Sequence, residues 1–217
     1  MKKISLVVAV VLLTGLAAMP VFANADRFEN LNRKVFYIND RLDHFALRPA
    51  AVTYKKLMPN PLEKGVENIF SNLDEVTNVV NDILQGKFRQ ACHDSGRFLL
   101  NTTLGLGGLF DIAKHAGLEK SDGEDFGQTL AVWGVGEGPY LMLPLMGPST
   151  LRDAPSKFVD SITSPFSYVD DVPTRNTARG VELLTKRAGL LEIDRVISGD
   201  KYLFVRDVYL QRSRYQV

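Results

Sequence analysis

The sequence has few of the residues that carry most enzyme chemistry. Its 217 residues include one cysteine, Cys92, and three histidines, His44, His93 and His115. A single cysteine cannot form an internal disulfide, so the fold has to be held by its core, and we interpret Cys92 as a small buried hydrophobe. Neither Gly-x-Ser-x-Gly nor His-Glu-x-x-His occurs, and no zinc or calcium ligand spacing appears. We therefore expect a protein that is not an enzyme, with no catalytic residues, metal or cofactor.

One run contains the residue types of a catalytic triad, His93-Asp94-Ser95. Adjacent residues of a helix point about 100° apart and do not face each other. The sequence therefore predicts that these three side chains do not act together.

The chain also has almost no net charge. Its 26 Lys and Arg against 25 Asp and Glu give a formal charge of +1, which becomes −1 without residues 1–25 because Lys2 and Lys3 leave with them. Nucleic-acid binding needs a basic patch or stripe, so no nucleic-acid partner is expected. With 45% hydrophobic and 24% charged residues, the composition is that of one globular domain.

The long apolar run of the chain lies at its N-terminus. Lys2 and Lys3 precede the apolar residues 4–13, and Ala23-Asn24-Ala25 then stands before Asp26. A basic start, a short apolar core and small residues at −3 and −1 are typical of a secretory signal peptide. A membrane anchor is the alternative, but the apolar run is short. We predict a signal peptide over 1–25, cleavage between Ala25 and Asp26, and an exported domain over 26–217.

The chain is organised around a charge-poor stretch over 125–152, in which only Glu137 is charged between the two ends. It holds the sole tryptophan, Trp133, and its helix-breaking residues are Gly134, Gly136, Gly138 and Pro139. A spanning helix needs about 20 uninterrupted apolar residues, and Pro144 interrupts the second apolar run before it could become a long strand. Backbone polar groups cannot be left bare in hydrocarbon. Such a stretch must be wrapped by the rest of the chain or lie at a membrane boundary.

A second charge-poor stretch runs from Phe98 to Phe110 and contains Gly105, Gly107 and Gly108. Each glycine weakens a helix by about 1 kcal/mol relative to alanine, which predicts a hinge or a close backbone approach. A bend between packed helices is the alternative. Gly-x-Gly-Gly is not a nucleotide fingerprint here, because no β-rich run precedes it.

Elsewhere the apolar positions recur every three or four residues, which predicts helices and no strand. The first apolar stripe consists of Phe28, Leu31, Val35, Ile38, Leu42 and Phe45. It fits a helix facing the core or one lying flat at a membrane interface; the mixed charges of the opposite face favour the core. We expect this helix to end near Arg48, because a residue before proline avoids the α region.

The remaining patterns complete a single all-α domain of about seven to nine helices. Helical spacing runs from Leu62 to Leu84 with Gly86 as the expected C-cap. Ser149 or Thr150 is expected to cap a helix, and Pro173 to open another.

Two charge-poor stretches in an exported chain offer an apolar surface that an acyl chain could follow. Polar neighbours that could accept a headgroup are Asn101, Thr102, Thr103, Gln128 and Thr129. A plain hydrophobic core explains the same composition, so both interpretations stay open.

Several long motifs resemble one known family in order and in content. They are N-R-K-V-F-Y-I-N-D at 32–40, L-R-P at 47–49, N-D-I-L-Q-G at 81–86, R-F-L-L-N-T-T-L-G-L-G-G-L-F-D at 97–111, D-F-G-Q-T-L-A-V-W-G-V-G-E-G-P-Y at 125–140 and L-P-L-M-G-P-S-T-L-R-D at 143–153. The chain resembles the MlaA/VacJ lipoproteins of Gram-negative outer membranes over essentially all of its predicted mature length.

The resemblance implies a fold and a function. The fold would be a helical, ring-like, membrane-embedded domain in the inner leaflet of the outer membrane, with an amphipathic channel. The function would be the transport of misplaced phospholipid from the outer leaflet to a periplasmic carrier of the MlaC type, which maintains outer-membrane lipid asymmetry. Phospholipid, a trimeric porin and the outer membrane are the other implied partners. The alternative function is a porin-associated interaction protein without lipid transfer; a lipid hydrolase would need a nucleophile that the sequence does not show.

By position in the family, two segments would line or gate the lipid path. Their residues are Leu104, Gly105, Leu106, Gly107, Gly108, Leu109 and Phe110, and Trp133, Gly134, Gly136, Gly138 and Tyr140. The six residues of the apolar stripe are the candidates for the membrane-interface helix.

One departure from the family concerns the lipid anchor. Family members usually carry a lipobox cysteine, and Leu16 stands here after Leu13-Thr14-Gly15. The chain therefore resembles a non-lipidated member on the periplasmic side of the outer membrane, attached through its own apolar rim or a porin, or partly periplasmic.

Overall fold

The computed structural model describes residues 26–195 and 197–217. The predicted signal peptide, including Ala25, lies outside the described residues. Helices dominate the described chain, as the sequence predicts, and one small antiparallel hairpin is added to them.

The α-helices are α2 (Glu29–Leu42), α3 (Arg48–Leu57), α4 (Asn60–Gln85), α5 (Phe88–Thr103), α6 (Ile112–His115), α7 (Phe126–Val132), α8 (Asp153–Thr163), α9 (Val172–Gly189) and α10 (Lys201–Tyr215). The strands are β1 (Tyr140–Leu143) and β2 (Gly147–Thr150). Short turns of other helix types are η1 (Asp43–Leu47), η2 (Pro165–Tyr168) and η3 (Ile193–Arg195).

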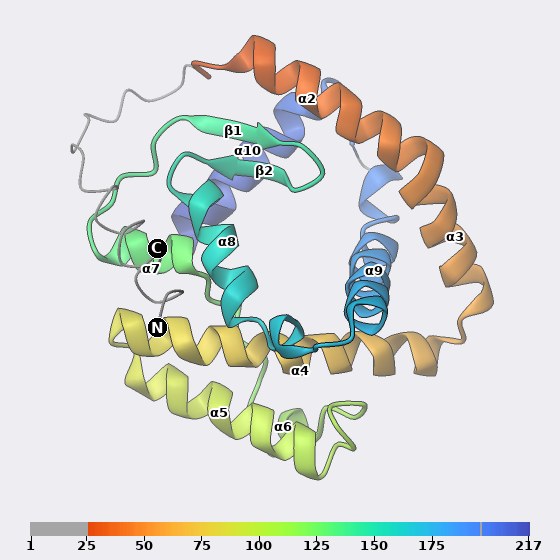
Figure 1. The fold of residues 1–217 in the computed structure, drawn as a ribbon, viewed down its shortest axis with the longest axis vertical. Coiled ribbons are helices and arrows are strands. Elements are labelled where there is room, and N and C mark those ends of the chain that lie inside the picture. Colours follow the sequence, from red (N-terminus) through yellow and green to blue (C-terminus); the bar gives the residue numbers. More distant parts are fainter. Residues whose placement is uncertain (1–25, 196) are drawn as a thin grey trace.

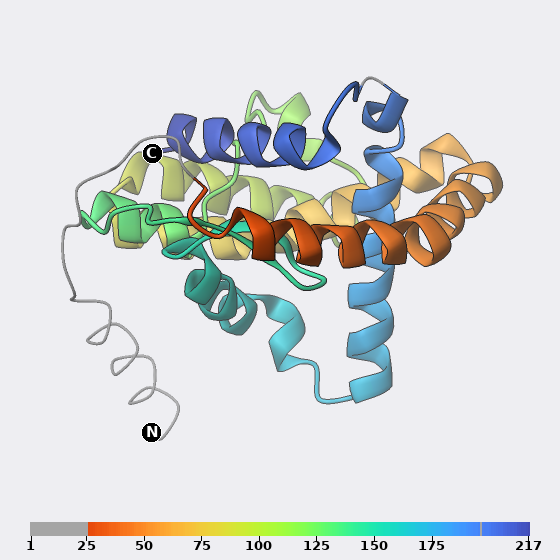
Figure 2. The same cartoon turned by 90° about the horizontal axis from the view of Figure 1, so that it is seen from above.

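The elements form a ring-like arrangement. Figure 1 shows α2, α3 and α4 following one another around its outline, with α7 and the hairpin on the remaining side. Figure 2 shows that α9 runs across the plane of this ring. The helices α5 and α6 lie outside the ring, on the side of α4 away from α8 and α9 (Figure 1).

The predicted end of the first helix near Arg48 is wrong. The chain turns through η1, a π-helical segment, and Arg48 keeps helical angles, φ −63° and ψ −48°. Pro49 then falls in the first turn of α3, directly after this π-helical segment. The local wider turn at η1 lets the chain pass a proline without leaving the helix.

Two other predicted ends are confirmed. Gly86 closes α4 in the left-handed conformation at φ 76°, which costs glycine little. Pro173 lies in the first turn of α9. The predicted cap at Ser149 or Thr150 is wrong, because both residues belong to β2 and the N-cap residue of α8 is Arg152; Thr150 nevertheless accepts the N–H of Asp153 at 3.2 Å.

The hairpin is the element that the helical periodicity did not predict. Tyr140 to Leu143 pair with Thr150 to Gly147, and the turn passes through Leu145 at φ 61°. Lys157 of α8 donates to the carbonyls of Met146 and Pro148 and fixes the turn. Pro144 limits the first strand, as expected, but does not prevent it.

A buried apolar cluster lies between the hairpin, α2 and α10. Tyr140, Met142 and Tyr202 are buried there, and Val35 and Phe36 of α2 pack against them. The Tyr140 and Tyr202 rings meet edge to face at 6.2 Å between centroids, a favourable aromatic geometry. This cluster joins the two ends of the described chain.

Candidate functional site

The described residues bury more polar side chains, and expose more large apolar ones, than an ordinary soluble domain does. The buried polar side chains of the neighbouring helices α4 and α5 are Asn72, Glu75, Asn78, Asn81 and Asp82 of α4 and Asp94, Arg97 and Asn101 of α5. Large apolar side chains of the same helices are exposed, among them Ile83 at 51% and Leu99 at 59%. Charged and amide groups are almost never fully buried unless they are paired, so these groups have to satisfy one another.

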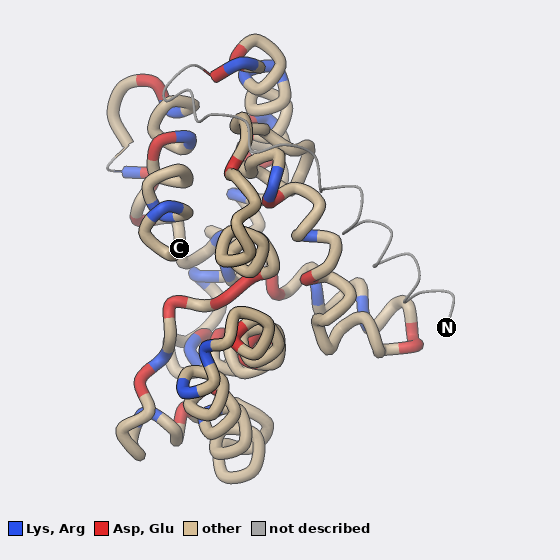
Figure 3. The backbone as a smooth tube through the Cα atoms, turned by 90° about the vertical axis from the view of Figure 1, so that its left-hand side faces the viewer, with Lys and Arg blue, Asp and Glu red and all other residues tan. Residues whose placement is uncertain are grey.

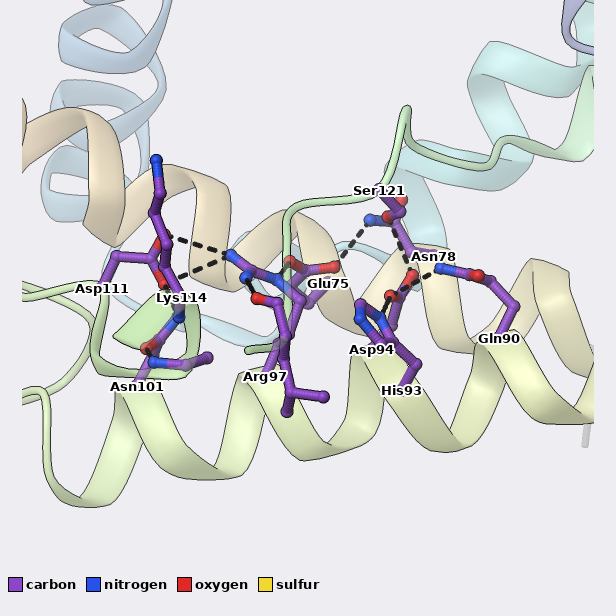
Figure 4. A network of polar contacts seen from close by, with 12 residues as sticks. Glu75, Asn78, Gln90, His93, Asp94, Arg97, Asn101, Asp111, Lys114 and Ser121 are labelled. Carbon is purple, nitrogen blue, oxygen red and sulfur yellow. Dashed lines mark hydrogen bonds and ion pairs between the residues drawn. The ribbon is translucent and has the colours of Figure 1, made fainter. Parts of the chain in front are cut away.

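The pairing is built around Arg97, which is 2% exposed. Its Nε donates to Glu75 Oε1 at 2.8 Å, its Nη2 lies 3.3 Å from Asp111 Oδ1, and its Nη1 donates to the carbonyl of Leu118 (Figure 4). Burial opposes the charge of Arg97, but the hydrogen bond that it donates to Glu75 and the charge of Asp111 leave its pKa raised. One guanidinium therefore joins α4, α5, α6 and the following loop.

Amide side chains extend this network on both sides. Asn78 donates to Glu75 Oε2 at 2.9 Å and accepts the N–H of Glu124 at 3.0 Å. Asn101 donates to Asp111 at 3.0 Å and accepts the N–H of Ala113 at 2.8 Å. A side-chain amide has both a donor and an acceptor, so each of these asparagines satisfies one carboxylate and one backbone N–H at the same time.

A second polar group lies where α4 meets α7 and α8. Thr129 donates to Asn81 Oδ1 at 2.9 Å, and Asp160 Oδ1 accepts the N–H of Phe126 at 3.0 Å. Burial and the charge of Asp125 raise the pKa of Asp160 to about 7. Burial and the charge of Asp94 raise the pKa of Asp82 to about 7, and both carboxylate oxygens of Asp82 lack a hydrogen-bond partner among the described residues.

The apolar stripe of the first helix faces outward. Leu31 is 58% exposed and Phe45 70%, and Phe28, Ile38 and Leu42 are also exposed, whereas Val35 packs on the apolar cluster. The core-facing interpretation of this stripe is therefore wrong for most of its residues. The buried residue of α2 is Asn32.

Two asparagines of α2 hold the edge of β1 through paired hydrogen bonds. Asn32 donates to Tyr140 O at 3.0 Å and accepts the N–H of Met142 at 2.8 Å. Asn39 donates to Leu143 O and accepts the N–H of Leu145, both at 2.9 Å. Asn32 and Asn39 are seven residues apart on the helix, and the two sites that they bind are three residues apart on the strand; both separations are about 10 Å. The two side chains therefore satisfy the backbone groups that a third strand would otherwise pair with.

The glycine loop, residues 104–110, joins α5 to α6. Leu104, Leu106 and Phe110 are each more than half exposed. Gly108, at φ 91°, lies so close to Asn72 that an added Cβ would be 2.7 Å from Asn72 Cβ. A close backbone approach is thus confirmed as one reason for these glycines.

The other candidate segment, 133–140, leads from α7 into β1. Trp133 is 48% exposed, and its Nε1 donates to Leu84 O at 3.1 Å. Gly134 and Gly138 have φ of 89° and 68°, and nothing lies within 4 Å of a Cβ added at Gly136. Tyr140 is buried in the apolar cluster.

The two segments are not brought together. The glycine loop packs on the first half of α4, where Asn68 donates to Leu109 O at 3.2 Å, and Trp133 contacts the last turn of α4 at Leu84. Sixteen helical residues correspond to about 24 Å. Asp26, the predicted first residue after cleavage, lies at neither segment: its carboxylate accepts hydrogen bonds from Asn32 of α2 and Tyr202 of α10.

Two sequence interpretations of reactive residues need correction. Cys92 is exposed rather than buried. His93 Nδ1 and Asp94 Oδ1 do face each other at 2.8 Å, and Ser121 rather than Ser95 donates to Asp94 (Figure 4). Because Ser121 and His93 both bind Asp94 and not each other, they form no triad.

The sequence reasoning named Asn101, Gln128 and Thr129, which are buried, but missed the buried polar residues of α4. Asn72, Glu75, Asn78 and Asp82 recur at spacings of three and four along α4. Polar residues at this spacing share one face of a helix, just as apolar residues at this spacing do, so the pattern could have identified the buried face. Within the described ranges, no helix is both long and apolar enough to cross a membrane, and no group of three or more His, Cys, Asp and Glu is placed to hold a metal ion.

These features define a class of protein: a ring-like helical fold (Figure 1) in which polar side chains are buried between helices and many large apolar side chains are exposed. A family model described as MlaA lipoprotein matches residues 24–216. The chain belongs to the MlaA lipoprotein family.

Relatives and a solved structure agree with this assignment. The intermembrane phospholipid transport system lipoprotein MlaA of Escherichia coli (strain K12) is 37% identical over 195 residues, which cover 87% of this chain and 76% of the relative. The protein of the same name from Haemophilus influenzae is 30% identical over 197 residues, covering 88% and 79%. A chain solved in work on the structural basis for maintenance of bacterial outer membrane lipid asymmetry is 38% identical, with a TM-score of 0.78, covering 89% of this chain and 99% of that one.

Proposed function

We propose that this chain is a component of intermembrane phospholipid transport that removes misplaced phospholipid from the outer leaflet of the outer membrane. The observation that carries the proposal is the inverted polarity of the fold, with buried amides and charges inside and exposed leucines and phenylalanines outside. The names of the relatives that it resembles along most of its length support the same function.

The apolar exterior supports a position in lipid. The stripe of α2 and the exposed side chains of the glycine loop would contact acyl chains, because each large apolar group left in water costs about 1.5–3 kcal/mol. The ring lies in the inner leaflet of the outer membrane in this proposal, on the periplasmic side, and no lipid anchor is required for it.

The polar side chains buried along α4 support a path for headgroups. Asn72 and Asp82 keep buried oxygens without a hydrogen-bond partner among the described residues, which a polar group could use, while acyl chains follow apolar surface. The cargo is passed to a periplasmic carrier of the MlaC type, a trimeric porin holds the ring in place, and the chain itself carries out no reaction.

The test is a count of surface phospholipid in a strain that lacks the gene for this chain. With a label that reacts only in the outer leaflet, surface phospholipid is expected to rise on deletion and to fall when the full chain is supplied again. If the count never changes while the chain still copurifies with a porin, the function is that of a porin-associated interaction protein without lipid transfer.

A further inference from the structure

A polar cavity lies outside the ring, between α4, α5 and the loop after α6. Its volume is about 270 Å³, and its lining includes Lys64, Glu67, Asn72, Arg97 and Lys120. A water molecule occupies about 30 Å³ in the liquid, so the cavity has room for a group of several non-hydrogen atoms. The side of α4 that lines it is the one away from α8 and α9 (Figure 1).

Some charged residues that line the cavity form ion pairs within the protein, and others do not. Arg97 and Asp111 bind each other in the buried network. Among the described residues, Lys64, Lys120 and Glu67 form no ion pair, and all three are exposed. The cavity therefore offers two free cations and one free anion to a ligand.

Asn72 gives a second and independent indication of a ligand. It is 3% exposed, and its Nδ2 donates to Thr102 at 2.8 Å. Its Oδ1 is buried and has no hydrogen-bond partner among the described residues. Because an unmet buried acceptor costs about 1–3 kcal/mol, a hydrogen-bond donor is expected to reach it when the cavity is filled.

The exposed apolar loop 104–110 lies next to the residues that line the cavity. Gly108 packs on Asn72, and Leu109 O accepts from Asn68, so the glycine loop contacts two of the lining residues. Leu104 and Leu106 of that loop are 65% and 70% exposed. Within the described chain, two lysines without an ion pair, a buried acceptor without a donor and an adjacent exposed apolar loop together match an amphiphile with a phosphate ester in its head.

We propose that this cavity binds the phosphate-bearing headgroup of a glycerophospholipid whose acyl chains lie over the glycine loop. Lys64 and Lys120 bind the phosphate, and Asn72 Oδ1 with Glu67 accepts from the ammonium or hydroxyl group beyond it. The proposal rests on the proposed function, since it gives that function a headgroup site, and it places this site outside the ring.

The experiment measures binding by the full chain in a neutral detergent, with bound lipid counted by native mass spectrometry across a lipid titration. The ligands are phosphatidylethanolamine, its soluble headgroup glycerophosphoethanolamine, and diacylglycerol, which lacks the phosphate. Phosphatidylethanolamine is expected to bind best. Equal binding of the soluble headgroup would remove the acyl part of the proposal, and equal binding of diacylglycerol would overturn it.

The variant Lys64→Gln/Lys120→Gln is expected to bind phosphatidylethanolamine about tenfold more weakly, because it loses two charge-assisted contacts. Its control, Lys34→Gln/Lys56→Gln, removes the same charge from exposed lysines of α2 and α3 and should bind within about twofold of the parent. Unchanged binding by the first variant, or an equal loss in the control, would overturn the proposal.

A third variant keeps the proposal testable if the double variant fails to fold. Glu67→Gln should weaken binding of phosphatidylethanolamine more than binding of phosphatidylglycerol, since only the former carries an ammonium group; an equal loss of both contradicts the role of Glu67.

The transport test is separate from the binding test. If headgroup binding is lost in the lysine variant but no chain changes surface phospholipid, the headgroup site is supported and the proposed transport function fails. If the lysine variant binds normally while the parent chain restores the surface count, the transport function is supported and the headgroup site fails.

Discussion

At the scale of single residues, most buried polar groups have a hydrogen-bond partner, and Asp82 is a charged exception with neither carboxylate oxygen paired among the described residues. It is 0% exposed, and burial together with the charge of Asp94 raises its pKa to about 7. Arg97 illustrates the opposite case, in which three partners compensate for burial. A buried group therefore keeps its charge when it has enough hydrogen-bond and ion-pair partners, and the degree of burial alone does not decide this.

Asp82→Asn is expected to stabilise the protein at pH 8 and to have little effect at pH 4. The carboxyl group is protonated in the folded state below about pH 7 and in the unfolded state only below about pH 4. The folded state therefore binds the additional proton between these values, and stability falls as pH rises through that window.

Thermal unfolding of parent and variant at pH 4, 6 and 8 measures this effect. The variant's Tm should exceed the parent's by about a few °C at pH 8, and the difference should shrink as the pH is lowered. A constant difference across the three pH values would show that Asp82 does not titrate as inferred.

At the scale of elements, the hairpin depends on α2 for its outer edge. Asn32 and Asn39 supply the donors and acceptors that a neighbouring strand would supply. A two-stranded hairpin alone is marginal in water, so these side chains, with Lys157 from α8, decide whether it forms.

Asn32→Ala should cost about 2–3 kcal/mol, because it leaves buried backbone groups of Tyr140 and Met142 without partners. Asn39→Ala should cost about 1 kcal/mol, since Asn39 is only partly buried. Chemical denaturation gives both values, and amide exchange at Met142 and Leu145 reports each site. Equal costs for the two variants would contradict this assignment of the hydrogen bonds.

The glycines of the two charge-poor segments should respond differently to alanine. A Cβ at Gly105 would collide with the carbonyl oxygens of Phe110 and Asn101, whereas a Cβ at Gly136 meets nothing within 4 Å. Gly105→Ala is expected to cost about 3 kcal/mol or more and Gly136→Ala about 0.5 kcal/mol or less.

Denaturation midpoints of the two glycine variants test this contrast. A tolerated Gly105→Ala would mean that the glycine loop opens at little cost, which would favour a hinge over a close-packed turn.

At the scale of the whole molecule, the distribution of charged residues does not indicate a binding surface, whereas the placing of polar and apolar side chains does. Lys, Arg, Asp and Glu are interspersed along the chain (Figure 3), in keeping with its formal charge of +1. What distinguishes the molecule is that its exposed positions include many leucines and phenylalanines while amides fill the interior.

Leu31→Glu/Phe45→Glu should weaken association with phospholipid vesicles while leaving the fold intact, because both side chains are more than half exposed. The loss of two apolar contacts is expected to raise the lipid concentration for half-binding by about tenfold or more. Vesicle flotation measures it, with Lys34→Glu as the control for added negative charge on α2. Equal flotation of parent and double variant would exclude the stripe as a lipid-contacting surface.

The amino-acid sequence by itself determined the helical class, the positions of Gly86 and Pro173 at helix ends, and the family. These follow from local causes: a 3.6-residue period, backbone angles that glycine or proline favours, and long ordered motifs. The sequence also indicated that the glycine loop is a place of close backbone approach.

Only the tertiary structure decided which face of each helix is inside. The spacing of Leu31, Ile38 and Phe45 shows that they share a face but not where that face points, and the usual assumption of an apolar core gave the wrong side. The hairpin was likewise decided by Asn32 and Asn39, more than 100 residues away in the chain. Long-range hydrogen bonds and the polarity of the interior are properties of the assembled ring, and local periodicity does not contain them.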